Sequence, residues 1–526
     1  MEGHGTIMRK HHILTAVAAA AVFSLGASTL ALAGEKSTSG GTFTYARSDS
    51  TTSFDLHQEI TENNAFAIDK VFESLVTFDN DGNIIDWLAE DHKISDDGLV
   101  YTFTLRDGLK FSDGTDVTAE DVKFSIERHL EVGGSLPIEA DVKSVEAVDE
   151  KTVEITLGTA YTPFLSELAN FSNGIIPKDF GGKTEEEFFK NPVGTGPFAV
   201  SEWDPSGDLT FVKNEYYWNG EVPYDNVEID FLSEDNKALA LQNGDINLVE
   251  NVTSTSDLET LKKDDNFNVS IGQGVRCGFA YINEKGILKD DALRQALQMA
   301  LDHKTMCEVT VGGLYTEGIS VLPSSLAYGY DNLKNPYTYN VDNAKKLLDD
   351  AGYKDTDGDG IREMNGKKIS INYITYENRR LSDFAQAIQT QLADIGIEAK
   401  INSMDADREW NKMVAGEYDL CDSNWITVGN GDPTEYLANW YGKSDANFCN
   451  YKNDKFDKLY EQLETEFDEA KRAKIIEQLQ QILIDDAAVV VHGYYNSSMI
   501  SDKTVTGADI HTADYYWLTT EIAPAK

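Results

Sequence analysis

The sequence predicts a protein of the α/β class, in which strands and helices alternate along the chain. Alternating apolar and polar residues mark several strands in the first half. In the second half, amphipathic helices are followed by short apolar strands. Of the 526 residues, 41% are apolar, which provides enough core for two to four packing units.

Strand and turn signals dominate the first half of the chain. After a Ser/Thr/Gly-rich leader, the first strand is expected at Thr42–Ala46. The segments Val100–Leu105 and Thr152–Leu157 alternate apolar and polar residues, as half-buried strands do. Between them, Thr118 and Asp121 have the spacing of a capping box, so a helix is expected to begin there.

Longer helices are expected in the second half. An apolar stripe between Ala292 and Leu301 predicts one helix. Two more are expected at Val341–Ala351 and Leu381–Asp394, each stopped by a glycine within two residues. Highly charged helices follow between residues 455 and 485, and Val489–Val491 reads as a buried strand. This alternation of helices with strands supports the α/β assignment.

The chain is strongly acidic, with 45 Lys and Arg residues against 90 Asp and Glu residues and a net charge of -45. Phosphate binding requires clustered Lys and Arg side chains, so a nucleic-acid partner is not expected. Solubility or a salty habitat is the favoured reason for the acidic surface, and a cationic ligand is the alternative.

Residues 1–33 have the three parts of a secretory signal peptide. Arg9 and Lys10 form its basic start, an apolar stretch follows, and Ala31–Ala33 has the small residues of a cleavage site. Met8 is an alternative start to Met1, and an uncleaved membrane anchor is an alternative to cleavage. Because no cysteine follows the cleavage site, we expect a periplasmic protein without a lipid anchor.

Four cysteines lie in the second half of the chain, without a CxxC motif or a Cys/His cluster. An oxidising compartment permits disulfides, and three connectivities exist for four cysteines. Pairing in sequence order, Cys277–Cys307 and Cys421–Cys449, is the arrangement we expect. A structural metal site on these residues is not expected.

Motifs in a fixed order extend over nearly the whole mature chain. They are Val71–Asp79, Asp81-Gly82, Trp87–Glu90, Ser95–Gly98, Tyr101–Gly108, Phe111–Thr115, Ala119–Phe124, Asn191–Phe198, Asn214–Trp218, Asn243–Ile246, Arg294–Leu297, Ala344–Gly352 and Asn430–Pro433. Together they resemble the solute-binding proteins of the peptide and nickel ABC importers, the large family five of such receptors. In this order the motifs are specific for the family and carry little information about its ligand.

The resemblance implies two α/β lobes joined by two crossing strands, with the ligand cleft between the lobes and an extra subdomain on the first lobe. By this resemblance, lobe I comprises about 41–72, 200–275 and 488–526. The extra subdomain is about 73–199, and lobe II is about 276–487. Closure of the lobes around a ligand would produce the form that the membrane permease docks.

The resemblance also places ligand contacts in the segment from Trp425 to Pro433, which includes Asn430 and Asp432. We expect it to be a loop that follows a strand ending near Leu420, because α/β proteins bind ligands beyond strand ends. Trp425 is expected to cover apolar ligand surface, and the alternative is a core position. Dipeptide-binding members place an aspartate where Gly429 stands here, so Asp432 is the carboxylate that remains.

Dipeptide-binding members also place an arginine for the ligand carboxylate after the strand that corresponds to Ile369–Ile374. By this resemblance, Arg379 or Arg380, a few residues beyond that strand, is expected to substitute for it, because arginine suits bidentate binding of a carboxylate. The alternative for both is a solvated position at a helix start. His492 and Tyr494 follow the last buried strand. Because some nickel-chelate members use a cleft histidine, His492 is a candidate ligand of a chelated metal, with a structural histidine as the alternative.

The segment Asp355–Gly360 matches positions 1, 3, 5 and 6 of a calcium loop through Asp355, Asp357, Asp359 and Gly360. Position 12 is Gly366, where the bidentate glutamate belongs, and a strand is expected in place of the following helix. We therefore predict a turn here, and the three aspartates remain secondary candidates for Ca²⁺.

Three classes of function compete for this chain: a ligand-binding receptor of an importer, an exported hydrolase, and a chaperone-like or adhesive protein, which no feature of the sequence singles out. A receptor that captures short peptides for an ABC importer is the leading hypothesis, because backbone hydrogen bonding needs no special side chain. A receptor for nickel with histidine, or for another small solute, is the alternative. An exported hydrolase is the remote alternative, since no Gly-x-Ser-x-Gly or His-Glu-x-x-His motif occurs. We expect a monomer without catalytic activity or cofactor, which works with an inner-membrane permease.

Overall fold

The structure of the protein is a computed structural model that describes residues 40–48, 50–58, 62–79, 83–428, 431–510 and 518–526. The expected signal peptide at 1–33, Gly429 and Asn430 lie outside these residues. Within the described residues, no helix has the length and apolarity needed to cross a membrane.

One large sheet runs through both lobes, with the strand order β17-β16-β18-β12-β19-β11-β1-β10-β9-β8. On the lobe I side its strands are β8 (Phe198–Trp203), β9 (Leu209–Lys213), β10 (Asn226–Phe231), β1 (Thr42–Arg47) and β11 (Leu248–Glu250). On the lobe II side they are β16 (Ser370–Tyr376), β17 (Glu398–Met404) and β18 (Leu420–Ile426), and β13 (Tyr315–Thr316) pairs with β19. β1 is parallel to both β10 and β11, and β16 is parallel to both β17 and β18.

Two long strands, β12 (Phe267–Ile282) and β19 (Val489–Asp502), cross from one lobe to the other as an antiparallel pair. Their register shifts between Gln273 and Cys277. The expected boundary between the lobes at 275/276 falls within this irregular stretch. From the sequence only the buried start of β19 was expected, because polar and small residues follow Val491.

The extra subdomain has its own sheet, in the order β4-β5-β7-β6. Its elements are β4 (Ala89–Ile94), β5 (Val100–Leu105), α2 (Ala119–Val132), β6 (Val142–Ala147) and β7 (Thr152–Leu157). The expected helix start is confirmed: Thr118 donates its backbone N–H to Asp121 and completes a capping box. The apolar face of α2, including Val122 and Ile126, packs on this sheet.

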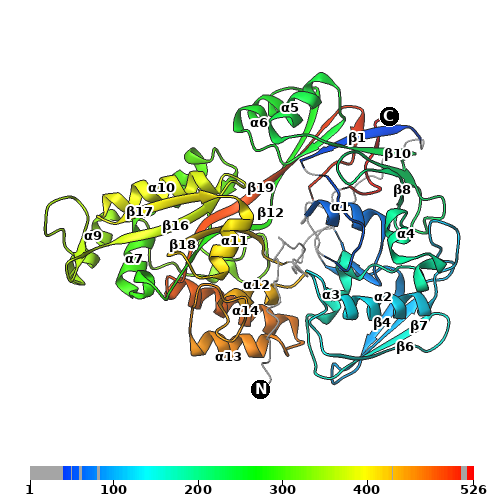
Figure 1. Ribbon diagram of the computed structural model, residues 1–526, viewed down its shortest axis with the longest axis horizontal. Helices are drawn as coiled ribbons and strands as arrows, with labels where there is room; N and C mark the ends of the chain where they lie inside the picture. The colour runs from blue at the N-terminus through cyan, green and yellow to red at the C-terminus, as the bar shows by residue number, and fades with distance from the viewer. Residues whose placement is uncertain (1–39, 49, 59–61, 80–82, 429–430, 511–517) are drawn as a thin grey trace, which may run out of the picture.

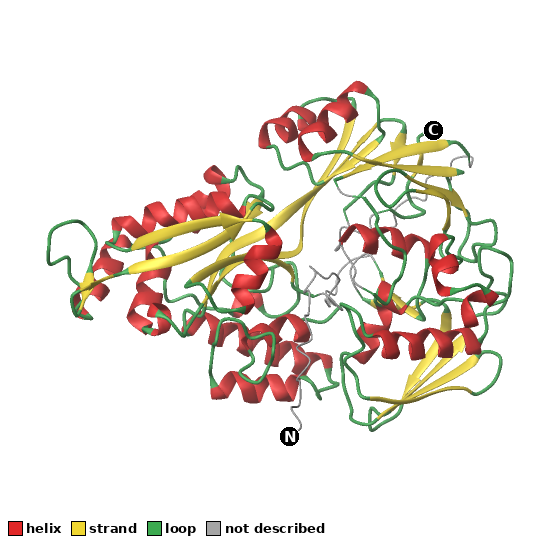
Figure 2. Cartoon of the chain, viewed as in Figure 1, coloured by secondary structure: helices red, strands yellow, loops and turns green. Residues whose placement is uncertain are grey.

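Helices cover both faces of the sheet in lobe II (Figure 2). One face packs against α7 (Asp291–Ala300), α9 (Val341–Asp350) and α10 (Leu381–Asp394). The other face packs against α11 (Ala406–Val414), α12 (Thr434–Leu437), α13 (Asp454–Leu463) and α14 (Glu469–Asp485).

The remaining helices and strands are short or lie outside the lobe II sheet. They are α1 (Glu62–Val71), β2 (Val76–Phe78), β3 (Ile84–Asp86), α3 (Phe164–Ala169), α4 (Glu185–Lys190), α5 (Glu234–Asn243), α6 (Thr255–Lys262), α8 (His303–Thr305), β14 (Glu363–Met364), β15 (Lys367–Lys368), β20 (Val505–Thr506) and β21 (Ala523–Pro524).

The prediction that a strand ends near Leu420 is wrong: β18 begins at Leu420 and continues to Ile426, so Trp425 belongs to the strand. The polar residues Asp422, Ser423 and Asn424 concealed this strand in the sequence. They are nevertheless buried, because helices cover both faces of the lobe II sheet, in which β18 is a central strand between β16 and β12.

The predicted disulfides are also wrong, because all four cysteines are buried free thiols. Each thiol has its own acceptor, which for Cys277 is the carbonyl of Gly278 at 3.6 Å. Cys307 donates to the carbonyl of His492 at 3.2 Å, Cys421 to the Glu409 carboxylate at 2.5 Å, and Cys449 to the carbonyl of Asn439 at 3.5 Å. A buried cysteine packs as a small apolar residue and does not need a disulfide partner. An oxidising compartment was therefore not a sufficient reason to predict disulfides.

Candidate ligand-binding cleft

A cavity of about 710 Å³ opens between the lobes, at the carboxyl ends of β1, β11 and β16. Its size is within the range of small-molecule sites, and strand ends are where α/β proteins bind ligands. Its charged lining residues are the cations Arg47, Lys237, Arg379 and Arg380 and the carboxylates Glu250, Glu377 and Asp383.

On the lobe I side, the cavity is lined by a buried network of charged groups at the ends of β1 and β11. Arg47 pairs with Glu250 at 2.8 Å, and its guanidinium lies 4.0 Å from the centre of the Phe66 ring. Lys237, from α5, donates to the Ser48 hydroxyl at 2.9 Å and to the carbonyl of Glu250 at 3.1 Å. Because these groups hold one another in place, this wall presents fixed polar groups to the cavity.

On the lobe II side, Arg379 and Arg380 form the turn between β16 and α10. Both have left-handed backbone conformations, with φ of 40° and 60°. The Tyr315 hydroxyl donates to the carbonyl of Arg379 at 2.9 Å, and the Arg379 guanidinium lies 5.5 Å from the Tyr495 ring centre. Asn251, on the opposite wall, also has a positive φ of 49°. Non-glycine residues with strained backbones cluster at functional sites. The presence of three such residues in the lining of this cavity supports its assignment as the functional site.

The electrostatics of the cavity differ from those of the whole protein. Four cations face three carboxylates here, although the chain carries a net charge of -45. In addition, α10 begins at Leu381, beside the cavity, so the positive end of its dipole is close by. Positive charge therefore exceeds negative charge at this position, which would favour a ligand with a carboxylate.

The lobes also touch away from the crossing strands, where the extra subdomain meets the loop between α13 and α14. Thr162 donates its backbone N–H to the carbonyl of Glu464 at 3.1 Å, and its hydroxyl to the carbonyl of Glu466 at 3.2 Å. The Phe467 ring packs on Gly98 and leaves no room for a β-carbon there. We call these five residues the rim contact. Through it, the two halves are joined at a second place besides the crossing strands.

Among the described residues that the sequence nominates as ligand contacts, Arg379 and Arg380 line this cavity, and the other four do not. Trp425 is half-buried near the end of β18; its indole N–H donates to Ser423 at 2.7 Å, and its ring lies 6.1 Å from that of Tyr436. Asp432 pairs with Arg472 and accepts the backbone N–H of Thr434 at 2.8 Å. This pairing gives Asp432 a role in ordering the start of α12.

His492 and Tyr494 lie in the interior of the protein. His492 is fully buried; its Nε2 is 2.7 Å from the Asp422 carboxylate, and its ring stacks on Phe384 at 4.7 Å. Tyr494 donates to the carbonyl of Ser320 at 2.8 Å. Side chains alternate across a strand, so the neighbouring Tyr495 lines the cavity instead.

Sequence reasoning missed the lobe I wall of the cavity. Arg47 directly follows the expected strand Thr42–Ala46, so the strand-end rule that was applied to the segment Trp425–Pro433 would have selected it. Lys237 gave no signal, because a lysine in a polar helix is usually a solvated residue.

In the part of the chain that the structure describes, one group of side chains is close enough together to hold a metal ion. It consists of Asp355, Asp357, Asp359 and Glu363, and it lies outside this cavity.

Comparisons with known proteins agree with this architecture. The family model of the bacterial extracellular solute-binding proteins, family 5 middle region, matches residues 83–448. The oligopeptide-binding protein AppA of Bacillus subtilis is 31% identical over 467 residues, which cover 82% of this chain and 83% of AppA. The nickel-binding periplasmic protein of Escherichia coli is 27% identical over 88% of this chain and 90% of its own. The structure of AppA in complex with a nonapeptide superposes with a TM-score of 0.78 at 26% identity, covering 93% of this chain and all of AppA.

Proposed function

Because the chain belongs to the bacterial extracellular solute-binding proteins of family 5, we propose that it captures short peptides in the interlobe cavity and delivers them to the permease of an ABC importer. In this proposal the protein acts in the periplasm as a monomer and as a binding protein without catalytic activity. The permease subunits of the inner membrane are its partners.

The observation that carries the proposal is the excess of cations at the carboxyl ends of the strands. The carboxylate of a peptide would bind beside Arg379 and Arg380, near the start of α10. Lys237 and Arg47 add positive potential from the opposite wall. A contact with both walls is available only when the lobes are closed, and such a contact shifts the population toward the closed form.

A nickel chelate is the second candidate, because a relative that matches 88% of this chain is a nickel-binding periplasmic protein. Its motivating residue, His492, is fully buried against Asp422, and no histidine lines the cavity among the residues that the structure describes. An anionic chelate would therefore depend on the same arginines as a peptide does. This makes the peptide the leading ligand.

The experiment is a titration calorimetry screen of the refolded, ligand-free protein. It uses tri- to pentapeptides with free or amidated carboxyl termini, and Ni²⁺ with and without free histidine. We expect peptides with a free carboxylate to bind, and Arg379→Gln to weaken them by roughly tenfold, since one charge-assisted contact is worth about 1.5–3 kcal/mol. Arg408→Gln, an exposed arginine of α11, is the matched control.

Each arm of this screen has a decisive result. Equal binding of amidated and free peptides would refute the carboxylate anchor while leaving peptide capture in place. Binding of Ni²⁺ with histidine in the absence of any peptide binding would replace the peptide by a metal chelate.

A further inference from the structure

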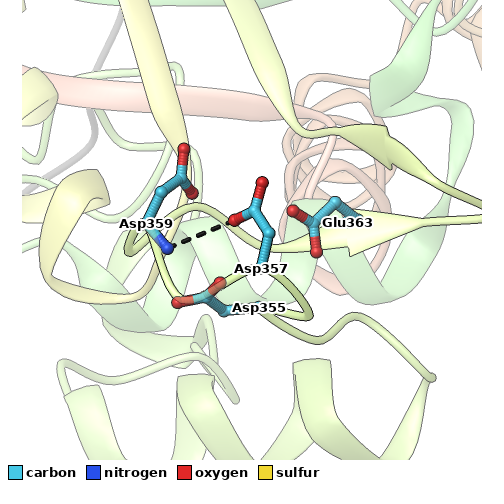
Figure 3. A group of neighbouring side chains, drawn as sticks. All are labelled: Asp355, Asp357, Asp359 and Glu363. Carbon is cyan, nitrogen blue, oxygen red and sulfur yellow. Dashed lines mark hydrogen bonds between the residues drawn. The ribbon is translucent and has the colours of Figure 1, made fainter.

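Four carboxylates meet in the loop between α9 and β16, at the end of lobe II remote from the crossing strands (Figures 1 and 3). Asp355, Asp357, Asp359 and Glu363 each offer one oxygen, and these oxygens all lie within 4.8 Å of one another. Two oxygens bound to the same Ca²⁺ at 2.3–2.6 Å lie no more than about 5 Å apart. The grouping therefore has the dimensions of a single coordination sphere.

Backbone hydrogen bonds shape this loop. Asp355 accepts the backbone N–H groups of Gly358 at 2.7 Å and Gly360 at 2.9 Å. Lys354 and Glu363 pair as an antiparallel bridge, which closes the loop at its base. These contacts account for the turn that the sequence predicts. They do not account for four like charges on one side of it.

Glu363 provides evidence for a bound cation that is independent of the grouping of carboxylates. Its side chain is only 6% exposed, and Figure 3 shows its carboxylate turned toward Asp357. One oxygen accepts from the backbone N–H and the hydroxyl of Thr356, at 2.7 and 2.8 Å. The other oxygen, Oε1, is buried and has no hydrogen-bond partner. A buried carboxylate oxygen without a partner is costly unless a cation reaches it.

We propose that this loop binds a Ca²⁺ ion through the carboxylates of Asp355, Asp357, Asp359 and Glu363. Ca²⁺ takes six to eight oxygen ligands in flexible arrangements, and carboxylates are its usual side-chain ligands. Ile361, at position 7 of the loop, is in the place from which a backbone carbonyl completes such a site.

The departure from the twelve-residue calcium loop also has a structural reason. Position 12 is Gly366, which lies in the turn between β14 and β15. Because the chain enters a strand and not a helix after Ile361, Glu363 at position 9 returns to the loop itself. It supplies the carboxylate that the helical version of the loop takes from position 12.

Lys368 is the cation that faces the cluster in this structure. Its ammonium group lies 3.1 Å from the Asp357 carboxylate and also pairs with Asp359. This contact lowers the pKa of Asp359 below its usual value. Lys368 is on β15 and partly exposed, so its side chain has room to leave when a divalent ion enters. A single positive charge leaves the Glu363 oxygen without a partner, whereas a central ion would contact all four carboxylates.

The site would fix the loop at the end of lobe II and would not contact the ligand of the cavity. The inference is therefore independent of the proposed function. Extracellular calcium modules bind with dissociation constants of about 10⁻⁴–10⁻³ M, and we expect a value in that range.

The test combines titration calorimetry with hydrogen–deuterium exchange on chelator-treated protein, using CaCl₂ and MgCl₂ as separate probes. We expect saturable Ca²⁺ binding and slower exchange in peptides that cover residues 354–366, with a weaker response to Mg²⁺. Glu363→Gln keeps an acceptor for Thr356 and should remain folded, which its thermal unfolding without metal will show. We expect this variant to bind Ca²⁺ at least tenfold more weakly.

Asp445→Asn removes an exposed carboxylate elsewhere in lobe II and controls for attraction of Ca²⁺ to the acidic surface. Its Ca²⁺ affinity and exchange protection should equal those of the natural protein. The proposal is overturned if no saturable binding occurs at about ten times the upper expected dissociation constant. It is also overturned if Glu363→Gln and the natural protein respond equally to Ca²⁺.

Discussion

Truncation of Phe467 at the rim contact should weaken ligand binding, although this residue lies outside the cavity. Its ring contacts Gly98 of the extra subdomain, so part of its buried surface exists only when the lobes are closed. Phe467→Ala removes that surface from the closed form and leaves the open form nearly unchanged. The closed population, and with it the apparent affinity, should fall.

The magnitude follows from the burial of the ring. Phe467 is 41% exposed, so three-fifths of its surface is covered. For a side chain of about 200 Å², this is roughly 120 Å², or about 3 kcal/mol at 25 cal/mol per Å². If half of this buried area is covered by the facing lobe, the substitution destabilises the closed form by about 1.5 kcal/mol, and the dissociation constant rises roughly tenfold.

The assay is titration calorimetry of Phe467→Ala with the tightest peptide from the screen above, accompanied by small-angle scattering of the ligand-free protein. Tyr216 provides a matched control, because its ring packs on Gly114 within one half of the molecule. Tyr216→Ala should reduce stability and leave affinity unchanged. A change of less than twofold for Phe467→Ala would refute the reasoning that the rim contact contributes to closure.

Three further predictions concern the interior. Asp422→Ala leaves Tyr373 and His492 without their buried partner and should lower the free energy of unfolding by roughly 3–5 kcal/mol in urea titrations; a loss below about 1 kcal/mol would contradict the network. Burial raises the pKa of Glu409 to about 8. Its value in the unfolded chain is about 4.3, so its contribution to stability is complete below that pH and declines as pH rises toward 8. Glu409→Gln keeps the acceptor for Cys421 and should make the free energy of unfolding less dependent on pH. At pH 8 this variant should unfold at a higher urea concentration than the natural protein. Parallel plots of stability against pH for the two proteins would show that Glu409 does not cause the pH dependence. Finally, dithiothreitol should not change the unfolding midpoint, and a thiol reagent should find four groups per chain only after denaturation; two or fewer would indicate disulfides.

Local patterns were sufficient for most regular elements of the fold. The helix Leu381–Asp394 and the strands Val100–Leu105 and Thr152–Leu157 have the bounds expected from periodicity and stop signals. β18 and most of β19 were not recognised, because their polar residues are buried by elements that are distant in sequence. Periodicity records only which face of a segment is apolar, so it cannot identify a strand that is covered on all sides.

The site was predictable only where the family resemblance pointed to a residue. Arg379 and Arg380 were found in this way, whereas Glu250 ends a strand of three residues that gave no pattern, and Asn251 follows that strand. His492 has the chemistry of a ligand, but its role depends on Asp422, which comes from a different strand. Which polar residues meet, and which of them are buried, is set by tertiary contacts that one sequence does not display.

The paired crossing strands have a consequence for how much free energy a ligand must supply. A single flexible linker would let the lobes tumble independently, and each capture would then have to restrict that motion. Two hydrogen-bonded strands already confine the lobes to a narrow set of orientations, and their pairing is irregular where the register shifts between Gln273 and Cys277. Much of the entropy of docking is therefore lost once, during folding, and not at each cycle of transport. For that reason we expect a few hydrogen bonds and one aromatic ring to be enough to favour closure.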